Sequence, residues 1–158
     1  MIASEIVADT SPLIAFKYAE AMDVLKSLFK MVVVSPAVWR ELTVKEKEFF
    51  ESLDFVVVKN PSDRRLVNAL QLMVDEGEAE AIVLALERKS KLMIDDLRGR
   101  KTSKKMRVSV LGVLGVLKLA KRSGVVKKVK PLIEKMISKG YYISRELVEK
   151  FLEDLGEV

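Results

Sequence analysis

The acidic residues of this sequence that could do chemistry together stand at the ends of apolar runs. Asp9 follows the run EIVA (5–8) directly, and Asp95 and Asp96 follow the run KLMI (91–94). In open α/β sheets, ligands bind beyond the carboxyl ends of the strands. If the two runs are neighbouring parallel strands, their terminal carboxylates therefore meet at one edge of the sheet.

Two other acids lie near the starts of expected helices. Glu41 stands in SPAVWREL, and Glu78 stands in DEGEAEAIVLALE. Helical spacing places Glu78 on one face with three apolar residues that follow it: Ala81, Ile82 and Ala85. This face must pack on the sheet, so we expect Glu78 to point toward the edge of the sheet, whereas Glu80 lies off the apolar stripe.

Each acid has a simpler explanation when it is taken alone. Asp9 is then a helix cap, Glu41 is a surface residue, and the other acids belong to a turn or favour the positive end of a helix dipole. Three or four carboxylates gathered at one edge would, however, repel one another unless a cation lay between them. Oxygen ligands without histidine favour Mg²⁺ or Mn²⁺. Thr10 or Ser11 would add a hydroxyl that orients a ligand, a water or a phosphate, and Ser11 would also cap the next helix.

The apolar pattern predicts the elements that must hold these residues. Short runs rich in valine and isoleucine are the expected strands: 5–8, 31–34, 55–58, 91–94 and 107–110. Strands that are apolar throughout suit a parallel sheet covered on both faces. Helices are expected after Ser11-Pro12 and Ser35-Pro36 and in the segments 62–74, 78–87, 125–138 and 144–155. We therefore predict an α/β protein, a three-layer α/β/α sandwich with a central, mainly parallel sheet of four or five strands. Residues 1–158 would form a single domain on which the C-terminal helices, about 125–155, pack.

The chain of 158 residues contains no cysteine and no histidine. Disulfides, thiolate chemistry and zinc sites built on these residues are excluded, and so is a histidine general base. An enzyme with this composition must use carboxylates, hydroxyls, lysines or a hard metal ion. No apolar run reaches the ~18 residues of a membrane helix, and the N-terminus lacks the pattern of a signal peptide. We therefore expect a cytoplasmic protein.

Basic residues are concentrated in one part of the chain. Segment 98–139 holds fourteen Lys or Arg residues and one acid, Glu134, a net charge of +13 that leaves −8 for the other residues. Such asymmetry indicates a polyanionic partner, with nucleic acid first, or a lysine-rich solvated surface. Arg98, Arg100 and Lys101 follow the acid pair directly, and we predict them as nucleic-acid contacts.

Aromatic residues are few, at 6% of the chain. Recognition of bases by stacking on an aromatic sheet is therefore not expected. Trp39 and the pair Tyr141–Tyr142 are assigned to the core or to an interface.

Four segments of the sequence, in this order, resemble the motifs of the PIN-domain family: VADTSPLIAF, SPAVWREL, GEAEAIVLALE and LMIDDLRGR. The run LGVLGVLKLAKRSGVV and the later GYYISRELVEKFLEDLGE resemble a prokaryotic PIN subgroup related to VapC-type toxins. The resemblance covers most of the chain. It implies a metal-dependent endoribonuclease, in which an acidic quartet binds Mg²⁺ or Mn²⁺ and cleaves RNA, and it suggests the toxin of a type II toxin–antitoxin pair.

Carried over by position, the resemblance assigns the catalytic role to four residues: Asp9, Glu41, Glu78 and Asp96. All but Glu41 would bind one or two metal ions directly, and Glu41 would act through water or behind the ligands. Glu80 and Asp95 are the alternatives for the third and fourth acids. Glu78 is preferred on the helix-face argument, and Asp96 is preferred because family members usually place this acid just past the strand.

The subgroup also implies a homodimer and an antitoxin protein as partners, and the apolar helices at 12–29 are the expected contact face. One departure from the family pattern is Val113 in LGVLG, where relatives often carry a hydroxyl residue. It leaves open a PIN fold with weakened catalysis that binds nucleic acid or serves in assembly. A Mg²⁺-binding receiver domain of signalling proteins is disfavoured, because Lys59 and Asn60 follow the third expected strand where a receiver needs an aspartate.

Overall fold

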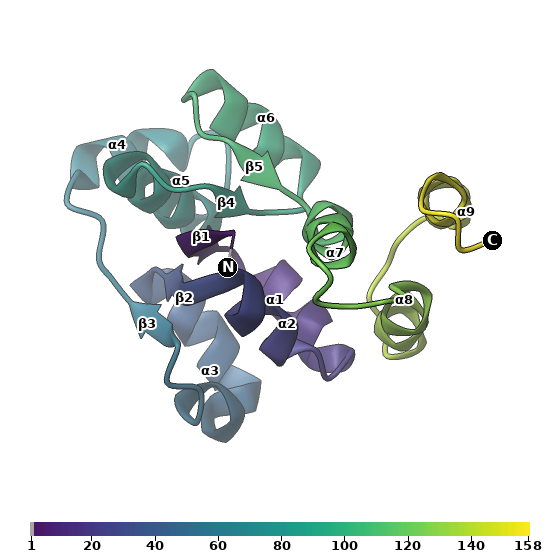
Figure 1. Ribbon diagram of the computed structural model, residues 1–158. Helices are drawn as coiled ribbons and strands as arrows, with labels where there is room; N and C mark the ends of the chain where they lie inside the picture. Colours follow the sequence, from purple (N-terminus) through teal and green to yellow (C-terminus); the bar gives the residue numbers. More distant parts are fainter. Residues whose placement is uncertain (1) are drawn as a thin grey trace.

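The computed structural model describes residues 2–158, in which strands and helices alternate around one central sheet (Figure 1). The sheet has five parallel strands in the order β3-β2-β1-β4-β5. The strands are β1 (Ala3–Ala8), β2 (Phe29–Val34), β3 (Val56–Val58), β4 (Leu92–Met93) and β5 (Val110–Leu111). The predicted fold class, an α/β/α sandwich around a parallel sheet, is confirmed.

Nine helices connect and follow the strands within residues 2–158. They are α1 (Thr10–Tyr18), α2 (Met22–Leu28), α3 (Pro36–Glu51), α4 (Arg64–Leu70), α5 (Glu76–Arg88), α6 (Leu97–Lys105), α7 (Val113–Arg122), α8 (Lys130–Ser138) and α9 (Arg145–Asp154). Ser35 and Ser144 cap α3 and α9, since each hydroxyl accepts a hydrogen bond from an amide of the first turn. No helix of the described chain is long and apolar enough to cross a membrane.

Alternate residues of β1 enter two separate cores. Ile6 and Ala8 pack with side chains of α1, α2, α3 and α7, whereas Val7 packs with side chains of α4 and α5. All three residues are fully buried, which explains why the run is apolar throughout. The sheet is therefore covered on both faces.

The order of the strands reverses at β1, so that later strands are added on its other side. The segment from β1 to β3 adds strands on one side of β1, and β4 and β5 lie on the other side. Ala8 pairs with Met93 in this central register, and the amide of Asp9 donates to the carbonyl of Met93 at 3.0 Å. In doubly wound sheets such a reversal leaves a crevice at the carboxyl ends of the strands, and both acidic strand ends of this chain face it.

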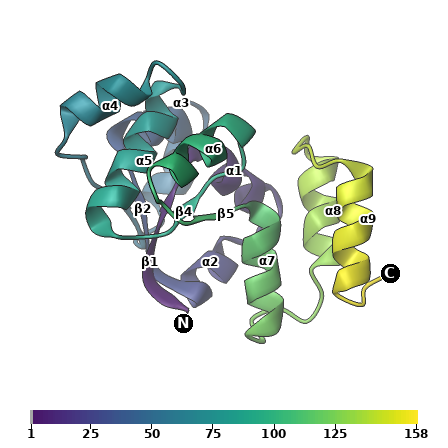
Figure 2. The same ribbon diagram turned by 90° about the horizontal axis from the view of Figure 1, so that it is seen from above.

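The two C-terminal helices lie side by side beyond α7 in both views (Figure 2). Ile133 and Met136 of α8 and Leu152 of α9 belong to the same core as α1. The end of the chain is fastened by Glu157, whose carboxylate accepts from Lys121 Nζ at 2.7 Å and from the amides of Val129 and Lys130, each at 3.0 Å.

Several predicted boundaries are wrong. The fifth strand was placed at 107–110 but begins at Val110, because Arg107 has a φ of 60° that an extended strand does not allow. The helix expected over 125–138 begins only at Lys130, after a positive φ at Gly124, and the segment 62–74 is helical only from Arg64 to Leu70. Ser11 is not a cap, since α1 already begins at Thr10 with Asp9 in the N-cap position.

Candidate active site

Carboxylates from distant parts of the chain line one pocket of about 630 Å³ at the crevice between β1 and β4. We call it the acidic pocket. Its acidic residues are Asp9, Glu41, Asp75, Glu78, Asp95 and Asp96, and Thr10 and Ser11 lie beside them. The structure therefore brings together all four residues predicted as catalytic.

Asp9 lies at the bottom of the pocket and is 8% exposed. It occupies the N-cap position of α1, but its side chain makes no capping hydrogen bond, so capping does not explain its presence. Burial, and after it the nearby charges of Asp75, Glu41 and Asp96, raise the pKa of Asp9 to about 7 against a hydrogen bond from the Thr10 amide. A buried carboxylate without a cationic partner is costly.

Glu78 enters the pocket from the first turn of α5. Its Oε1 accepts from the Asp75 amide at 3.2 Å, and Asp75 Oδ1 accepts from the Glu78 amide at 2.8 Å, which forms a capping box. Its Oε2 is buried and has no hydrogen-bond partner within residues 2–158. Burial, and after it the neighbouring carboxyl group of Asp96, raise the pKa of Glu78 to about 8.

The acid pair after β4 divides between two positions. Asp96 caps α6, since its Oδ2 accepts from the Gly99 amide at 2.9 Å, and this bond, with one from Glu78, lowers the pKa of Asp96. Asp95 accepts from the Val113 amide at 3.0 Å and from the hydroxyl of Tyr141. Asp95 therefore fastens the end of β4 to α7 and to the α8–α9 turn, while Asp96 faces Glu78.

Glu41 reaches the pocket from the second turn of α3 and is exposed to solvent. A Cβ added to Gly77 would lie 2.5 Å from Glu41 Oε1, so the Glu41 side chain lies directly over the start of α5. Partial burial raises the pKa of Glu41, against the opposite effect of the neighbouring Thr10 hydroxyl. The absence of a side chain at Gly77 is what lets Glu41 approach the other carboxylates.

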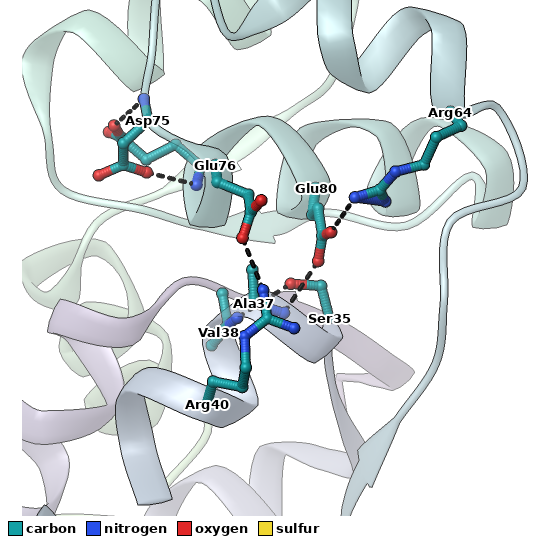
Figure 3. Close-up of polar contacts among 9 residues, drawn as sticks. Ser35, Ala37, Val38, Arg40, Arg64, Asp75, Glu76 and Glu80 are labelled. Carbon is teal, nitrogen blue, oxygen red and sulfur yellow. Dashed lines mark hydrogen bonds and ion pairs between the residues drawn. The ribbon is translucent and has the colours of Figure 1, made fainter. Parts of the chain in front are cut away.

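Glu80 faces a different part of the structure (Figure 3). It is 2% exposed, accepts from the Ala37 amide at 2.9 Å, and pairs with Arg64 at 2.5 Å. The Glu80 carboxylate thus accepts a hydrogen bond from the first turn of α3, where the backbone amides have no acceptor within the helix. The helix-face argument for Glu78 over Glu80 agrees with these positions.

The predicted basic contacts also separate. Arg98 and Lys101 line a cavity of about 580 Å³ that shares Asp75, Glu78 and Asp96 with the acidic pocket. Arg100 lies on the other side, beside Asp95 and Gly112. We call Arg98 and Lys101 the basic rim, because they are the predicted cations that border the carboxylates.

Comparisons with known proteins identify the family. A family model described as a PIN domain matches residues 5–157. The chain belongs to the PIN-domain family. PIN domains are generally nucleases and usually bind divalent metal, so this chain has a nuclease-type fold.

The fold of this PIN domain is similar to a solved structure of a PilT N-terminus domain protein from the hyperthermophilic archaeon Sulfolobus solfataricus. The TM-score is 0.52 at 20% identity, and the alignment covers 73% of this chain and 92% of the other. A search of curated proteins finds no match.

The donor atoms of this PIN domain fit a hard divalent cation. They are carboxylate oxygens, and the buried Oε2 of Glu78 lacks any partner in the described chain. As the side chains stand, however, no three acidic residues within 2–158 are close enough together to hold one ion. Binding would therefore require side-chain rotation, which the solvent exposure of Glu41 and Asp96 favours.

Sequence reasoning missed several residues of the pocket, among them Asp75, Tyr141 and Tyr142. Asp75 was overlooked, although its position three residues before Glu78 in DEGE is the spacing of a capping box. Tyr141 and Tyr142 line the pocket as well. Tyr142 is 83% exposed and therefore lies outside the core, while its alternative assignment to an interface stays a prediction. No periodic pattern marks these tyrosines, because they lie in the turn between α8 and α9.

Proposed function

We propose that this PIN domain is a metal-dependent endoribonuclease that hydrolyses phosphodiester bonds of RNA. The observation that carries the proposal is the gathering of carboxylates in one pocket, from the ends of β1 and β4 and from α3 and α5. Among them Glu78 has a buried oxygen that has no partner in the described part of the chain. Carboxylates that repel one another and are partly desolvated favour a site that a cation completes.

Asp9, Glu78 and Asp96 are the residues that would hold Mg²⁺ or Mn²⁺. A bound divalent ion would supply an activated water near neutral pH and offset negative charge on the phosphate. Glu41 and Asp75 lie nearer solvent and would hold water around the ion. The buried side chain of Asp9 fixes the floor of the site, and the capping box fixes the first turn of α5 from which Glu78 projects.

Arg98 and Lys101 support RNA as the substrate. They lie beside the carboxylates in a cavity that opens into the acidic pocket, where they can contact phosphates on either side of the cleaved bond. Their charge would attract a polyanion toward a site that is itself acidic.

The test is cleavage of a generic RNA with Mg²⁺ or Mn²⁺, with and without EDTA. We expect Asp9→Asn and Glu78→Gln to lower the cleavage rate by at least about 100-fold. Glu76→Gln is the matched control, since Glu76 lies in the same first turn but pairs with Arg40 outside the pocket. Equal activity of the wild type, Asp9→Asn and Glu78→Gln would refute the proposal.

A second candidate function is a PIN fold that binds RNA without cutting it. It is favoured by Val113, which is 1% exposed and offers the site only its amide, already bonded to Asp95. Metal-dependent RNA binding by the wild type without cleavage would support this alternative.

We also propose, from the resemblance of the C-terminal half to VapC-related proteins, that the enzyme acts as a toxin with an antitoxin protein as partner and forms a homodimer. The apolar side chains of α1 and α2 are mostly buried within the chain, which leaves little of the predicted 12–29 face for a second copy. Growth arrest on expression of the wild type, absent with Asp9→Asn and relieved by the neighbouring gene, is expected. Sedimentation measures the oligomeric state.

A further inference from the structure

A second cavity opens beside the acidic pocket and has no part in the chemistry proposed above. Its volume is about 510 Å³, within the range of sites that hold small organic ligands. It lies between β5, the first turn of α7 and the α8–α9 turn, and it shares Asp95, Tyr141 and Tyr142 with the acidic pocket. We call it the tyrosine cavity. If a phosphate of a bound polynucleotide lies in the acidic pocket, a group next to that phosphate can therefore reach this cavity.

The lining of the tyrosine cavity is mixed. Its apolar part comes from β5, α7 and α9: Val110, Leu111, Val113, Leu114 and Leu147. Leu147 is 51% exposed and Tyr142 is 83% exposed, so the mouth of the cavity presents an aromatic ring and an aliphatic side chain to solvent. Large apolar side chains of this exposure next to a polar pocket suit a flat ligand with a polar edge.

The polar groups of the cavity are held in place by the fold. Asp95 accepts the hydroxyl of Tyr141 and the amide of Val113, which fixes the α8–α9 turn against α7. Arg100 lies beside Asp95, and an added Cβ at Gly112 would meet both, at 2.7 Å from Arg100 Nη1 and 2.8 Å from Asp95 Oδ1. The guanidinium thus lies where it can donate to a ligand in the cavity.

We propose that the tyrosine cavity is a nucleobase subsite, in which Tyr142 stacks on the base next to the cleaved phosphodiester and Arg100 donates to the edge of that base. The inference rests on the proposed function for its substrate, RNA. The cation at Arg100, the basic rim beyond Asp96 and the continuity with the acidic pocket favour a polyanion over an apolar peptide. Every base has a π face, so stacking gives affinity without fixing the sequence.

The experiment uses the full chain carrying Asp9→Asn, so that RNA is bound but not cut, and a pentanucleotide RNA with 2-aminopurine at one position. Stacking of the probe on Tyr142 is expected to quench its fluorescence. Tyr142→Ala in this background should abolish the quenching and weaken binding at least about fivefold. Tyr142→Phe keeps the ring and is the matched control, with quenching retained. Tyr142 is exposed, so neither change removes core packing, and circular dichroism verifies the fold.

The outcomes separate this proposal from the proposed function. Quenching that depends on the ring of residue 142, in a chain whose wild type cuts no RNA, would support the subsite and refute the nuclease. Metal-dependent cleavage together with unchanged binding and quenching in Tyr142→Ala would refute the subsite alone. Loss of quenching in both Tyr142 variants would also overturn it, because the hydroxyl and not the ring would then be responsible. Unchanged RNA binding with loss of dimer in sedimentation would overturn it in favour of a contact between copies of the chain.

Discussion

Replacing Asp9 by asparagine should stabilise the metal-free protein at neutral and alkaline pH, although it removes a residue of the proposed active site. The carboxylate is 8% exposed and has no capping hydrogen bond, and burial raises its pKa from 3.8 to about 7. Asparagine has nearly the same shape and carries no charge, so it avoids the penalty of burying an ionised group among other acids.

The size of the effect follows from linkage. A pKa raised by about three units corresponds to roughly 4 kcal/mol lost by the folded state when Asp9 is ionised, at about 1.4 kcal/mol per unit. The asparagine amide must itself be desolvated, which costs about 1–2 kcal/mol. The net gain is therefore about 2–3 kcal/mol, or a rise in Tm of about 5–10 °C for a domain of this size.

The raised pKa of Asp9 also predicts how the difference in stability between Asp9→Asn and the wild type changes with pH. Well below pH 4, Asp9 binds a proton in both the folded and the unfolded chain, so it contributes no difference. Between pH 4 and pH 7 the unfolded chain loses this proton while the folded chain keeps it, and the free energy of unfolding of the wild type falls. The amide cost of about 1–2 kcal/mol should then leave Asp9→Asn slightly less stable than the wild type well below pH 4, and its stability relative to the wild type should rise between pH 4 and pH 7 and stay constant above it.

The assay is thermal or urea unfolding in EDTA from pH 4 to pH 9, repeated with Mg²⁺ or Mn²⁺. The divalent ion should raise the Tm of the wild type at pH 8 and raise that of Asp9→Asn less. Glu80→Gln is the control, since this buried carboxylate has partners in Arg64 and Ala37 and its loss should destabilise by about 1–3 kcal/mol. An Asp9→Asn variant no more stable than the wild type in EDTA at pH 8 would refute the reasoning.

Three further predictions concern the surroundings of the site. Gly77→Ala should lower RNA cleavage at least about 10-fold with little change in Tm, because the new Cβ displaces the flexible end of Glu41; unchanged cleavage would show that Glu41 is dispensable. Arg98→Gln and Lys101→Gln should each weaken RNA binding similarly for all sequences and reduce the slope of log K against log salt by about one. Glu157→Gln should lower the free energy of unfolding near pH 7 and hardly change it at pH 3. Burial raises the pKa of Glu157, but the bonds from Lys121 and two amides outweigh it and lower the pKa, so the stabilisation is present above the usual pKa and lost in acid.

The parts of the fold that follow a periodic rule could be predicted from the sequence. Runs that are apolar throughout located the central strands, because both faces of the sheet are covered. The start of the edge strand β5 was predicted wrongly. Two of the four residues expected in it, Arg107 and Ser109, are exposed to solvent, and Arg107 adopts a left-handed conformation. Local backbone conformation of this kind leaves no periodic trace.

The carboxylates of the candidate site were predictable for a similar reason. Asp9 and Asp96 follow strands whose register is fixed by burial, and Glu78 lies on the buried face of α5. Asp75 and the two tyrosines were not predicted, because Asp75 is a helix cap and the tyrosines lie in a turn. Their neighbours in space are distant in sequence. The burial of Glu80 was equally invisible, since its partners come from α3 and α4.

The fastening of Glu157 to α7 and α8 has a practical consequence for any biochemical study. Glu157 lies three residues after α9, so a purification tag fused directly after Val158 would lie close to the bonds that hold this part of the chain against α7 and α8. Loosening α9 would also loosen the loop that carries Tyr142, and substrate affinity would change through a residue far from the chemistry. Recombinant protein for affinity measurements is best tagged ahead of β1, which begins at the opposite end of the strands from the acids.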